Sequence, residues 1–347
     1  MRTGRRGWWR RDAALLAAAL LVLGGGVAGC GKADSPATPA TAPGMVIATS
    51  FYPMQIMTLN VAAGVPGVTV RMVAPPQAGC LHEYALTTRD LKIISTAQAL
   101  VINGSGMESY IDKVVQQYPR LALIDASRDF HDTAAERAGK PDGHEAEHRH
   151  DDAGEHADHQ GDAGAQSAGH EHHGEGVNPH HWVSISRALI QVAAIADQLA
   201  AFDPAHAAAY RVNAQAYIAK LTDLRVRMHA ALDPLPQRTI VTFHEAFPYF
   251  AEEFNLTIAA VIEREPGTEP TPAEVAATVR QLRALGGKLP LFAEPQYSSS
   301  AAAIIARETG ANVYYLNPGV TGDETPDAYL RTMERNMATL QQALRGE

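Results

Sequence analysis

Short apolar runs alternate with longer amphipathic stretches along most of the chain after residue 44. The short runs are rich in Val, Ile and Leu and are bounded by turn residues, which is typical of strands buried in a parallel sheet. This alternation predicts an α/β fold with parallel-type sheets flanked by helices. The predicted strands are Met45–Thr49, Val68–Val73, Ala99–Ile102, Leu121–Ile124, Thr239–Phe243, Thr257–Val261, Leu289–Ala293 and Asn312–Leu316.

The amphipathic stretches between these runs predict the helices. Local start signals support them, such as the capping-box spacing of Thr271 and Glu274 with Pro272 at the head of the helix. The predicted helices are Pro53–Ala63, Thr88–Thr96, Met107–Tyr118, Ser186–Ala200, Ala246–Phe254, Thr271–Leu285, Ser299–Thr309 and Pro326–Leu344.

The longest helical pattern begins at Asp203-Pro204, an N-cap followed by proline, and runs to Leu232 without a breaker. A helix of about 30 residues spans about 45 Å, which is long for an ordinary crossover. We therefore expect residues 203–232 to form a rigid linking helix between two lobes, an N-terminal one (residues 45–182) and a C-terminal one (residues 238–347).

The first 29 residues have the pattern of a cleaved leader. Five arginines between residues 2 and 11 precede the apolar run Ala13–Leu23, and Val27-Ala28-Gly29 then leads into Cys30. This resembles the lipobox of bacterial lipoproteins, which predicts a lipid on Cys30 and a place in the periplasm or cell envelope. An ordinary signal peptide and a membrane span are the alternatives, although the apolar run is short for a span of about 20 residues. Residues 30–44, rich in Pro, Ala and Thr, predict a flexible tether.

The net charge and the number of cysteines exclude some classes of function and some covalent links. The net charge is −9, and removal of the leader, with five Arg and one Asp, changes it to −13. An acidic chain argues against nucleic-acid binding and weakly favours a cationic ligand. Two cysteines are present, so acylation of Cys30 leaves Cys80 without an internal disulfide partner.

A histidine-rich tract occupies residues 141–176 and contains acids, glycine and alanine but no Leu, Ile, Val or aromatic residue. It has nothing apolar to bury, so we expect a solvated, mobile insertion whose imidazoles suit zinc, copper or nickel. One interpretation is a collector or sensor of loosely held zinc. The other is a solvated loop that binds metal only as any histidine tag does.

Residues 144–148 of this tract match H-E-x-x-H, the zinc-protease signature. That motif acts only on a stable helix, and this low-complexity sequence lacks apolar periodicity. We therefore predict that the protein is not an enzyme.

Three histidines outside the tract and one carboxylate lie near the ends of predicted strands: His82, His180, His244 and Glu294. Ligands of open α/β sheets bind beyond the carboxyl ends of strands, and three imidazoles with a carboxylate or water form a tetrahedral zinc site. A single histidine is more often a polar surface residue than a ligand. His181 is equally placed to take the role of His180, and Glu294 is equally placed to cap a turn.

Several motifs occur in one order along the chain. They are Pro75-Pro76, His82-x-Tyr84, Asp90, Asn103-Gly104, Asn178-Pro179-His180-x-Trp182, His244-Glu245-Ala246-Phe247-x-Tyr249-Phe250 and Phe292-Ala293-Glu294-Pro295-Gln296. Together they resemble the zinc-type solute-binding proteins of bacterial metal ABC importers, and the histidine-rich insertion is typical of the zinc-binding members.

The resemblance implies two α/β lobes joined by one long helix, with the metal held between them. The implied ligands are His82, His180 and His244. The fourth position falls at or near Glu294 and is vacant or water-filled in some zinc-type relatives. The sequence also departs from the family: Cys80, two residues before His82, is unusual. A thiolate there is able to join or replace a zinc ligand, although a small loop residue is the simpler interpretation.

The implied function is a monomeric receptor that captures Zn²⁺ outside the cytoplasmic membrane and delivers it to a permease and its ATPase. An envelope zinc chaperone or storage protein would use the same site without a permease. A manganese or iron importer subunit is the third alternative. Manganese prefers more oxygen ligands than this set offers, which favours zinc.

Overall fold

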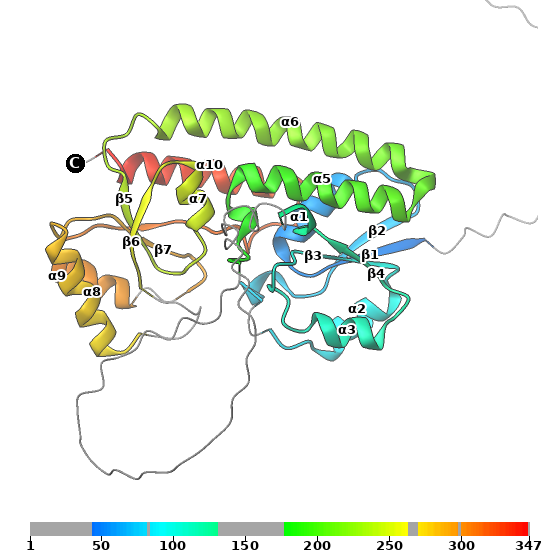
Figure 1. The fold of residues 1–347 in the computed structure, drawn as a ribbon, viewed down its shortest axis with the longest axis horizontal. Helices are drawn as coiled ribbons and strands as arrows, with labels where there is room; N and C mark the ends of the chain where they lie inside the picture. The colour runs from blue at the N-terminus through cyan, green and yellow to red at the C-terminus, as the bar shows by residue number, and fades with distance from the viewer. Residues whose placement is uncertain (1–43, 82–83, 131–176, 263–269, 298–299, 346–347) are drawn as a thin grey trace, which may run out of the picture. The chain divides into compact units, whose positions relative to one another are not determined.

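The computed structural model describes residues 44–81, 84–130, 177–262, 270–297 and 300–345. Two parallel four-stranded sheets flanked by helices make up this part of the chain (Figure 1). The predicted leader and tether with Cys30, the histidine-rich tract and His82 all lie outside the described residues. The predicted α/β fold class is confirmed.

The first sheet has the strand order β2-β1-β3-β4, and each neighbouring pair is parallel. The chain moves from β1 outward to β2, then crosses back to β3 on the other side of β1. A crevice forms at such a reversal, beyond the carboxyl ends of the two central strands. The strands are β1 (Met45–Thr49), β2 (Val68–Met72), β3 (Ala99–Ile102) and β4 (Ala122–Asp125).

The second sheet repeats this topology with the order β6-β5-β7-β8, again with parallel pairs. Its reversal lies between β5 and β7, so residues that follow these two strands gather at one edge. The strands are β5 (Thr239–Thr242), β6 (Thr257–Val261), β7 (Leu291–Ala293) and β8 (Val313–Tyr315).

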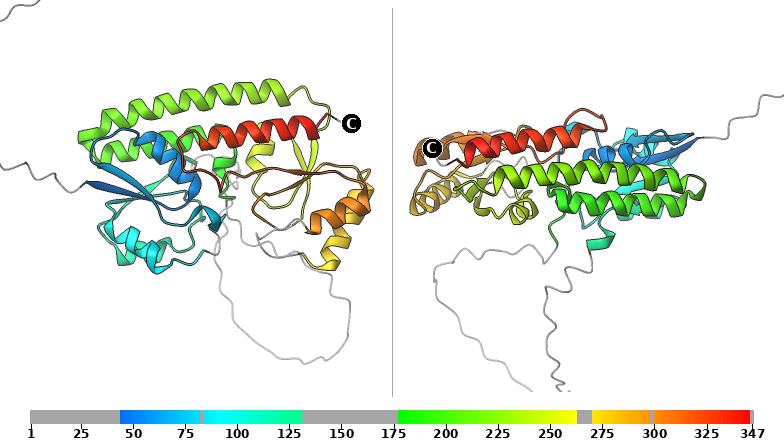
Figure 2. Two further views of the ribbon diagram at one scale, coloured as in Figure 1. Left: turned by 180° about the vertical axis from the view of Figure 1, so that it is seen from behind. Right: turned by 90° about the horizontal axis from the view of Figure 1, so that it is seen from above.

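Helices cover both faces of the sheets. Helices α1, α5, α6 and α10 lie on one side, while α2 and α3 cover the opposite face of the first sheet and α8 and α9 that of the second (Figures 1 and 2). The bounds are α1 (Tyr52–Val61), α2 (Thr88–Thr96), α3 (Ile111–Gln117), α5 (Ile185–Phe202), α6 (Ala207–Leu232), α7 (Pro248–Glu253), α8 (Pro272–Ala284), α9 (Ser300–Thr309) and α10 (Ala328–Ala343).

The helix predicted over residues 203–232 is divided into the 3-10 turn Pro204–His206 and α6, which has 26 residues. At 1.5 Å per residue α6 is about 39 Å long. It packs along α5 and also contacts α1 and α10. Its buried side chains recur every three or four residues, which gives one continuous apolar stripe: Tyr210, Ala214, Tyr217, Leu221, Leu224, Met228 and Leu232.

Helix α3 begins later than predicted, at Ile111 rather than Met107. The buried carboxylate of Glu108 accepts the backbone N–H groups of Asn103 and Gly104, at 2.8 and 3.1 Å. Because Glu108 binds this turn, its own segment folds back onto the end of β3 instead of starting a helix. Gly104 has φ of 78°, which favours glycine at that position.

Burial raises the pKa of Glu108 from 4.5 to about 7, and the nearby charge of Asp125 adds to the effect. The folded protein therefore holds this proton at higher pH than the unfolded chain does. The contribution of Glu108 to the free energy of unfolding should be fully present below about pH 4.5 and should be lost as pH rises through about 7, a change on the order of 3 kcal/mol.

Urea denaturation of the wild type and of Glu108→Gln across this pH range checks the prediction. In Glu108→Gln the free energy of unfolding should not show this decrease with pH, whatever the absolute stability of the variant. Equal slopes for the two proteins would contradict the assignment.

The segment between β8 and α10 is held against residues of the first lobe. The indole N–H of Trp182 donates to the carbonyl of Pro318 at 2.8 Å. The hydroxyl of Tyr52 donates to the carbonyl of Asp323 at 2.7 Å. The amide of Asn60 donates to the carbonyl of Pro326 at 2.8 Å. The chain therefore passes between the lobes a second time, through a crossing segment (residues 317–327) fixed by three hydrogen bonds.

Candidate metal centre

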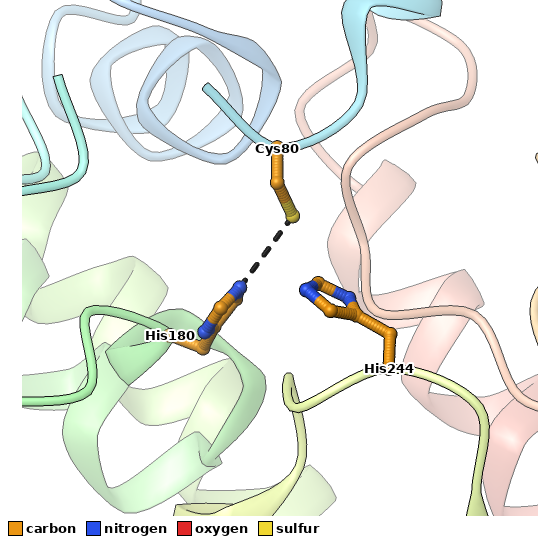
Figure 3. Close-up of side chains that lie close together, drawn as sticks. All are labelled: Cys80, His180 and His244. Atoms are coloured by element: carbon orange, nitrogen blue, oxygen red, sulfur yellow. Dashed lines mark hydrogen bonds between the residues drawn. The ribbon is translucent and has the colours of Figure 1, made fainter. Parts of the chain in front are cut away.

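Three side chains with metal-binding atoms converge where loops from both sheets meet (Figure 3). Cys80 lies in the loop between β2 and α2, His180 lies just before the 3-10 turn His181–Val183, and His244 lies two residues after β5. One ligand atom from each of the three lies within 4.8 Å of the others. Both histidines are 2% exposed. The group offers two nitrogen donors and one sulfur donor.

The closest approach in this group joins Cys80 Sγ to His180 Nε2, at 3.5 Å. The rings of His180 and His244 lie with centroids 4.9 Å apart and nearly perpendicular. In Figure 3, His180 and His244 extend from opposite sides and point their rings toward the sulfur of Cys80. The shared space between the three side chains is therefore where a cation would bind.

Asn178 fixes the orientation of the His180 ring. Its Nδ2 donates to the carbonyl of Glu245 at 2.9 Å, so its Oδ1 faces His180. That oxygen accepts the backbone N–H of His180 and also contacts Nδ1 of the ring, both at 3.0 Å. Because Oδ1 is an acceptor, Nδ1 carries the proton and Nε2 presents its lone pair toward Cys80.

Replacement of Asn178 by leucine should weaken cation binding at this group by about 10- to 100-fold, because the acceptor that selects the tautomer of His180 is lost. Asn178→Asp keeps an acceptor at this place and should retain most of the affinity. Competitive titration against a chelator of known affinity measures both. Equal losses for the two variants would show that Asn178 does not act through the imidazole.

Glu294 follows β7 directly and lies beside His244. Its Oε1 is 3.3 Å from Nδ1 of His244, and both side chains are buried. The two atoms do not form a well-directed hydrogen bond, and neither has another such partner among the described residues. The second oxygen of Glu294 accepts the amide of Gln296 at 2.7 Å. Glu294 is outside the group of three ligand atoms.

His181 is adjacent to His180 in sequence but lies in a separate environment. Its Nδ1 accepts from Arg187 at 3.3 Å, which leaves Nε2 to donate to Ser105 Oγ at 2.9 Å. Its ring is stacked between Phe130 and Tyr249, with centroid distances of 4.2 and 5.0 Å. Both ring nitrogens therefore contact protein groups, and His181 is not part of the ligand group.

The structure thus brings His180 and His244 together and places Glu294 against the second of them. His82 lies outside the described residues, so its role as a ligand stays a prediction. The histidine-rich tract and the H-E-x-x-H match within it are outside as well. Cys80, two residues before His82, is outside the predicted set of His82, His180, His244 and Glu294, although its thiolate was an open alternative.

The fold and this group of side chains define a two-lobed α/β protein in which two buried imidazoles and one partly buried thiol meet at the carboxyl edges of the sheets. The chain belongs to the family described as zinc-uptake complex component A periplasmic, whose profile matches residues 47–343. This confirms the resemblance found in the sequence.

Individual relatives differ in the metal named for them. The zinc-binding protein AdcA of Streptococcus pyogenes is 27% identical over 307 residues, which cover 85% of this chain and 55% of AdcA. The manganese-binding lipoprotein MntA of Halalkalibacterium halodurans is 24% identical and covers 90% of this chain and 92% of its own. The chain therefore spans about half the length of AdcA and nearly all of MntA.

Among solved structures, FpvC of Pseudomonas aeruginosa in complex with Mn²⁺ is similar, with a TM-score of 0.68 and 29% identity. The match covers 87% of this chain and 98% of FpvC. The arrangement of two parallel-sheet lobes is therefore shared along nearly the whole length of that protein.

Proposed function

We propose that this chain is the extracytoplasmic receptor of a metal ABC importer, which captures Zn²⁺ and delivers it to a permease and its ATPase. The observation that carries the proposal is the convergence of two almost fully buried imidazoles, His180 and His244, in a chain of this family. Imidazole nitrogens that face one space from separate loops are donors that Zn²⁺ binds in proteins.

In this proposal His82, His180 and His244 hold the ion as neutral imidazoles, and no bond of a substrate is broken. The protein therefore acts as a receptor and not as an enzyme. Cys30 carries a lipid that keeps the receptor at the membrane, and the name of MntA as a lipoprotein supports this assignment. Envelope storage or chaperoning of zinc would use the same residues, and no described residue favours it.

For Glu294 the geometry favours a role different from that of a ligand. Its carboxylate lies 3.3 Å from Nδ1 of His244, and a small reorientation of either side chain would let it accept the proton of that nitrogen. The other ring nitrogen of His244 is then left for the metal, as in the carboxylate–histidine–zinc arrangement. Asn178 does the same for His180, so each imidazole has its own orienting acceptor.

Zinc is favoured over manganese by the donors. Zn²⁺ is bound in proteins by imidazole nitrogen and thiolate sulfur, whereas Mn²⁺ favours carboxylate, carbonyl and water oxygens. The relatives include proteins named for zinc, such as AdcA, and for manganese, such as MntA. The assignment of zinc therefore rests on the donor atoms of His180, His244 and Cys80, which are nitrogen and sulfur and include no oxygen.

Competitive titration of Zn²⁺ against Mn²⁺ tests the proposal on the full chain and on a variant that lacks residues 141–176. Both proteins should bind one zinc ion tightly and prefer it to manganese, and the deletion should lower only the total number of ions bound. Loss of all tight binding on deletion would show that the tract, and not His180 and His244, is the site. Preference for manganese would reject the zinc assignment.

A further inference from the structure

We propose that Cys80 is a ligand of the metal site and binds the ion through its thiolate together with the imidazoles of His180 and His244. The inference deepens the proposed function, on which it rests, by adding a sulfur donor to the same site. The carrying observation is that Sγ of Cys80 and one nitrogen of each histidine lie within 4.8 Å of one another.

The distance from Cys80 Sγ to His180 Nε2 suits two ligands of one zinc ion. Zinc binds sulfur at about 2.3 Å and nitrogen at about 2.0–2.1 Å, so a tetrahedral site separates these two atoms by about 3.6 Å. The observed separation is 3.5 Å. These two side chains therefore already have the spacing that a bound ion requires, before any rearrangement.

The loop positions Cys80 through a glycine that no other residue can easily replace. Gly79 has φ of 68°, and a Cβ built on it would lie 2.6 Å from the hydroxyl oxygen of Tyr297. Tyr297 belongs to the C-terminal lobe, and its phenol occupies the space beside Gly79, the residue that precedes Cys80. Burial, followed by the charges of Cys80 and Glu294, raises the pKa of Tyr297, which keeps this phenol protonated.

The contact between Cys80 and His180 also describes the metal-free protein. Nδ1 of His180 is bound to Asn178, so Nε2 accepts and the thiol of Cys80 donates. When the ion binds, the thiol proton leaves to solvent, and the sulfur and Nε2 lone pairs both turn to the metal. The hydrogen bond between the two side chains is lost, and the hydrated ion releases one water ligand for each of Cys80, His180 and His244 that it binds. The same two atoms therefore contact each other in the metal-free protein and bind the ion in the metal-bound protein.

A sulfur donor changes which metals the site prefers. Thiolate favours zinc and softer ions over manganese, which binds oxygen donors. In this proposal Cys80 therefore contributes to affinity for Zn²⁺ and hardly at all to affinity for Mn²⁺. The discrimination between the two metals, and not only the strength of binding, should depend on this residue.

The test uses the full chain with Cys30→Ser in every variant, so that Cys80 is the only thiol. Co²⁺ added in place of zinc should give a near-ultraviolet thiolate-to-cobalt absorption with one equivalent, and Cys80→Ser should abolish it. The histidine-rich tract contains no sulfur and cannot produce this signal. Cys80→Ser should also weaken zinc binding at least about 10-fold, while Mn²⁺ affinity changes less than about 3-fold.

Absence of the cobalt–thiolate absorption in the parent protein would overturn the inference, as would unchanged zinc affinity in Cys80→Ser. His244→Ala separates this failure from failure of the proposed function. If His244→Ala loses tight zinc binding while Cys80→Ser does not, the receptor site stands and only the sulfur ligand is rejected. If neither substitution affects tight binding, the proposed site itself is wrong.

Discussion

Replacement of His244 by alanine should weaken zinc binding by about 100- to 1,000-fold. Structural zinc sites in zinc-finger peptides contribute about 10–16 kcal/mol from four ligands, so a single ligand accounts for about 2.5–4 kcal/mol. At about 1.4 kcal/mol for each tenfold change, that is two to three orders of magnitude in affinity. The ring of His244 is 2% exposed and is one of the three side chains in the ligand group, so water has little access to substitute for it.

Competitive titration measures the loss, and urea denaturation of the metal-free protein shows whether the variant still folds. His244→Gln gives a second variant of similar size if alanine destabilises the fold around the buried Glu294. His206→Ala is the matched control, because His206 pairs with Asp203 at 2.7 Å and lies outside the ligand group. An affinity within about threefold of wild type in both His244 variants would remove this residue from the site.

Trp182→Ala should lower the free energy of unfolding by about 3–5 kcal/mol, the range for truncation of a buried large aromatic side chain. Trp182 is fully buried and packs edge-to-face on Phe51 with ring centroids 5.0 Å apart. Its indole N–H binds the carbonyl of Pro318, and its ring lies 5.2 Å from that of His180. The substitution should therefore also loosen the support of a ligand.

Urea denaturation of metal-free protein measures this effect without a contribution from bound zinc. Trp182→Phe keeps most of the apolar area but leaves the carbonyl of Pro318 unpaired, which should cost about 1–3 kcal/mol. Phe202→Ala serves as the control, because Phe202 is 39% exposed and should cost much less. Similar losses for Trp182→Ala and Phe202→Ala would contradict the packing argument.

The fold was predictable because the strands are short apolar runs, of which β3 and β7 at the centres of the sheets are buried along their whole length. β1, β3 and β6 have the bounds predicted from these runs. The start of α3 was missed, since it depends on Glu108 binding the backbone of Asn103 and Gly104. Such a contact between a side chain and the turn just before it leaves no periodic signal in the sequence.

The site was predictable where local position decides it. His244 follows a strand, and the carboxyl ends of central strands converge at one edge. The distinction between His180 and His181 was not predictable, since it depends on Arg187 and Ser105 binding the second ring. The place of Cys80 is likewise a tertiary property, because the loop that carries it lies against Tyr297 from the other lobe.

The crossing segment restricts the motions by which a metal ion would enter and leave the proposed site. Two lobes joined by a single connection can rotate widely about it, but here α6 and the crossing segment both connect the two lobes (Figure 1). Hydrogen bonds from Tyr52 and Asn60 hold the crossing segment against the first lobe. Two connections restrict the rotation of one lobe relative to the other, so we expect the ion to enter and leave through small movements of the loops around Cys80 and His180.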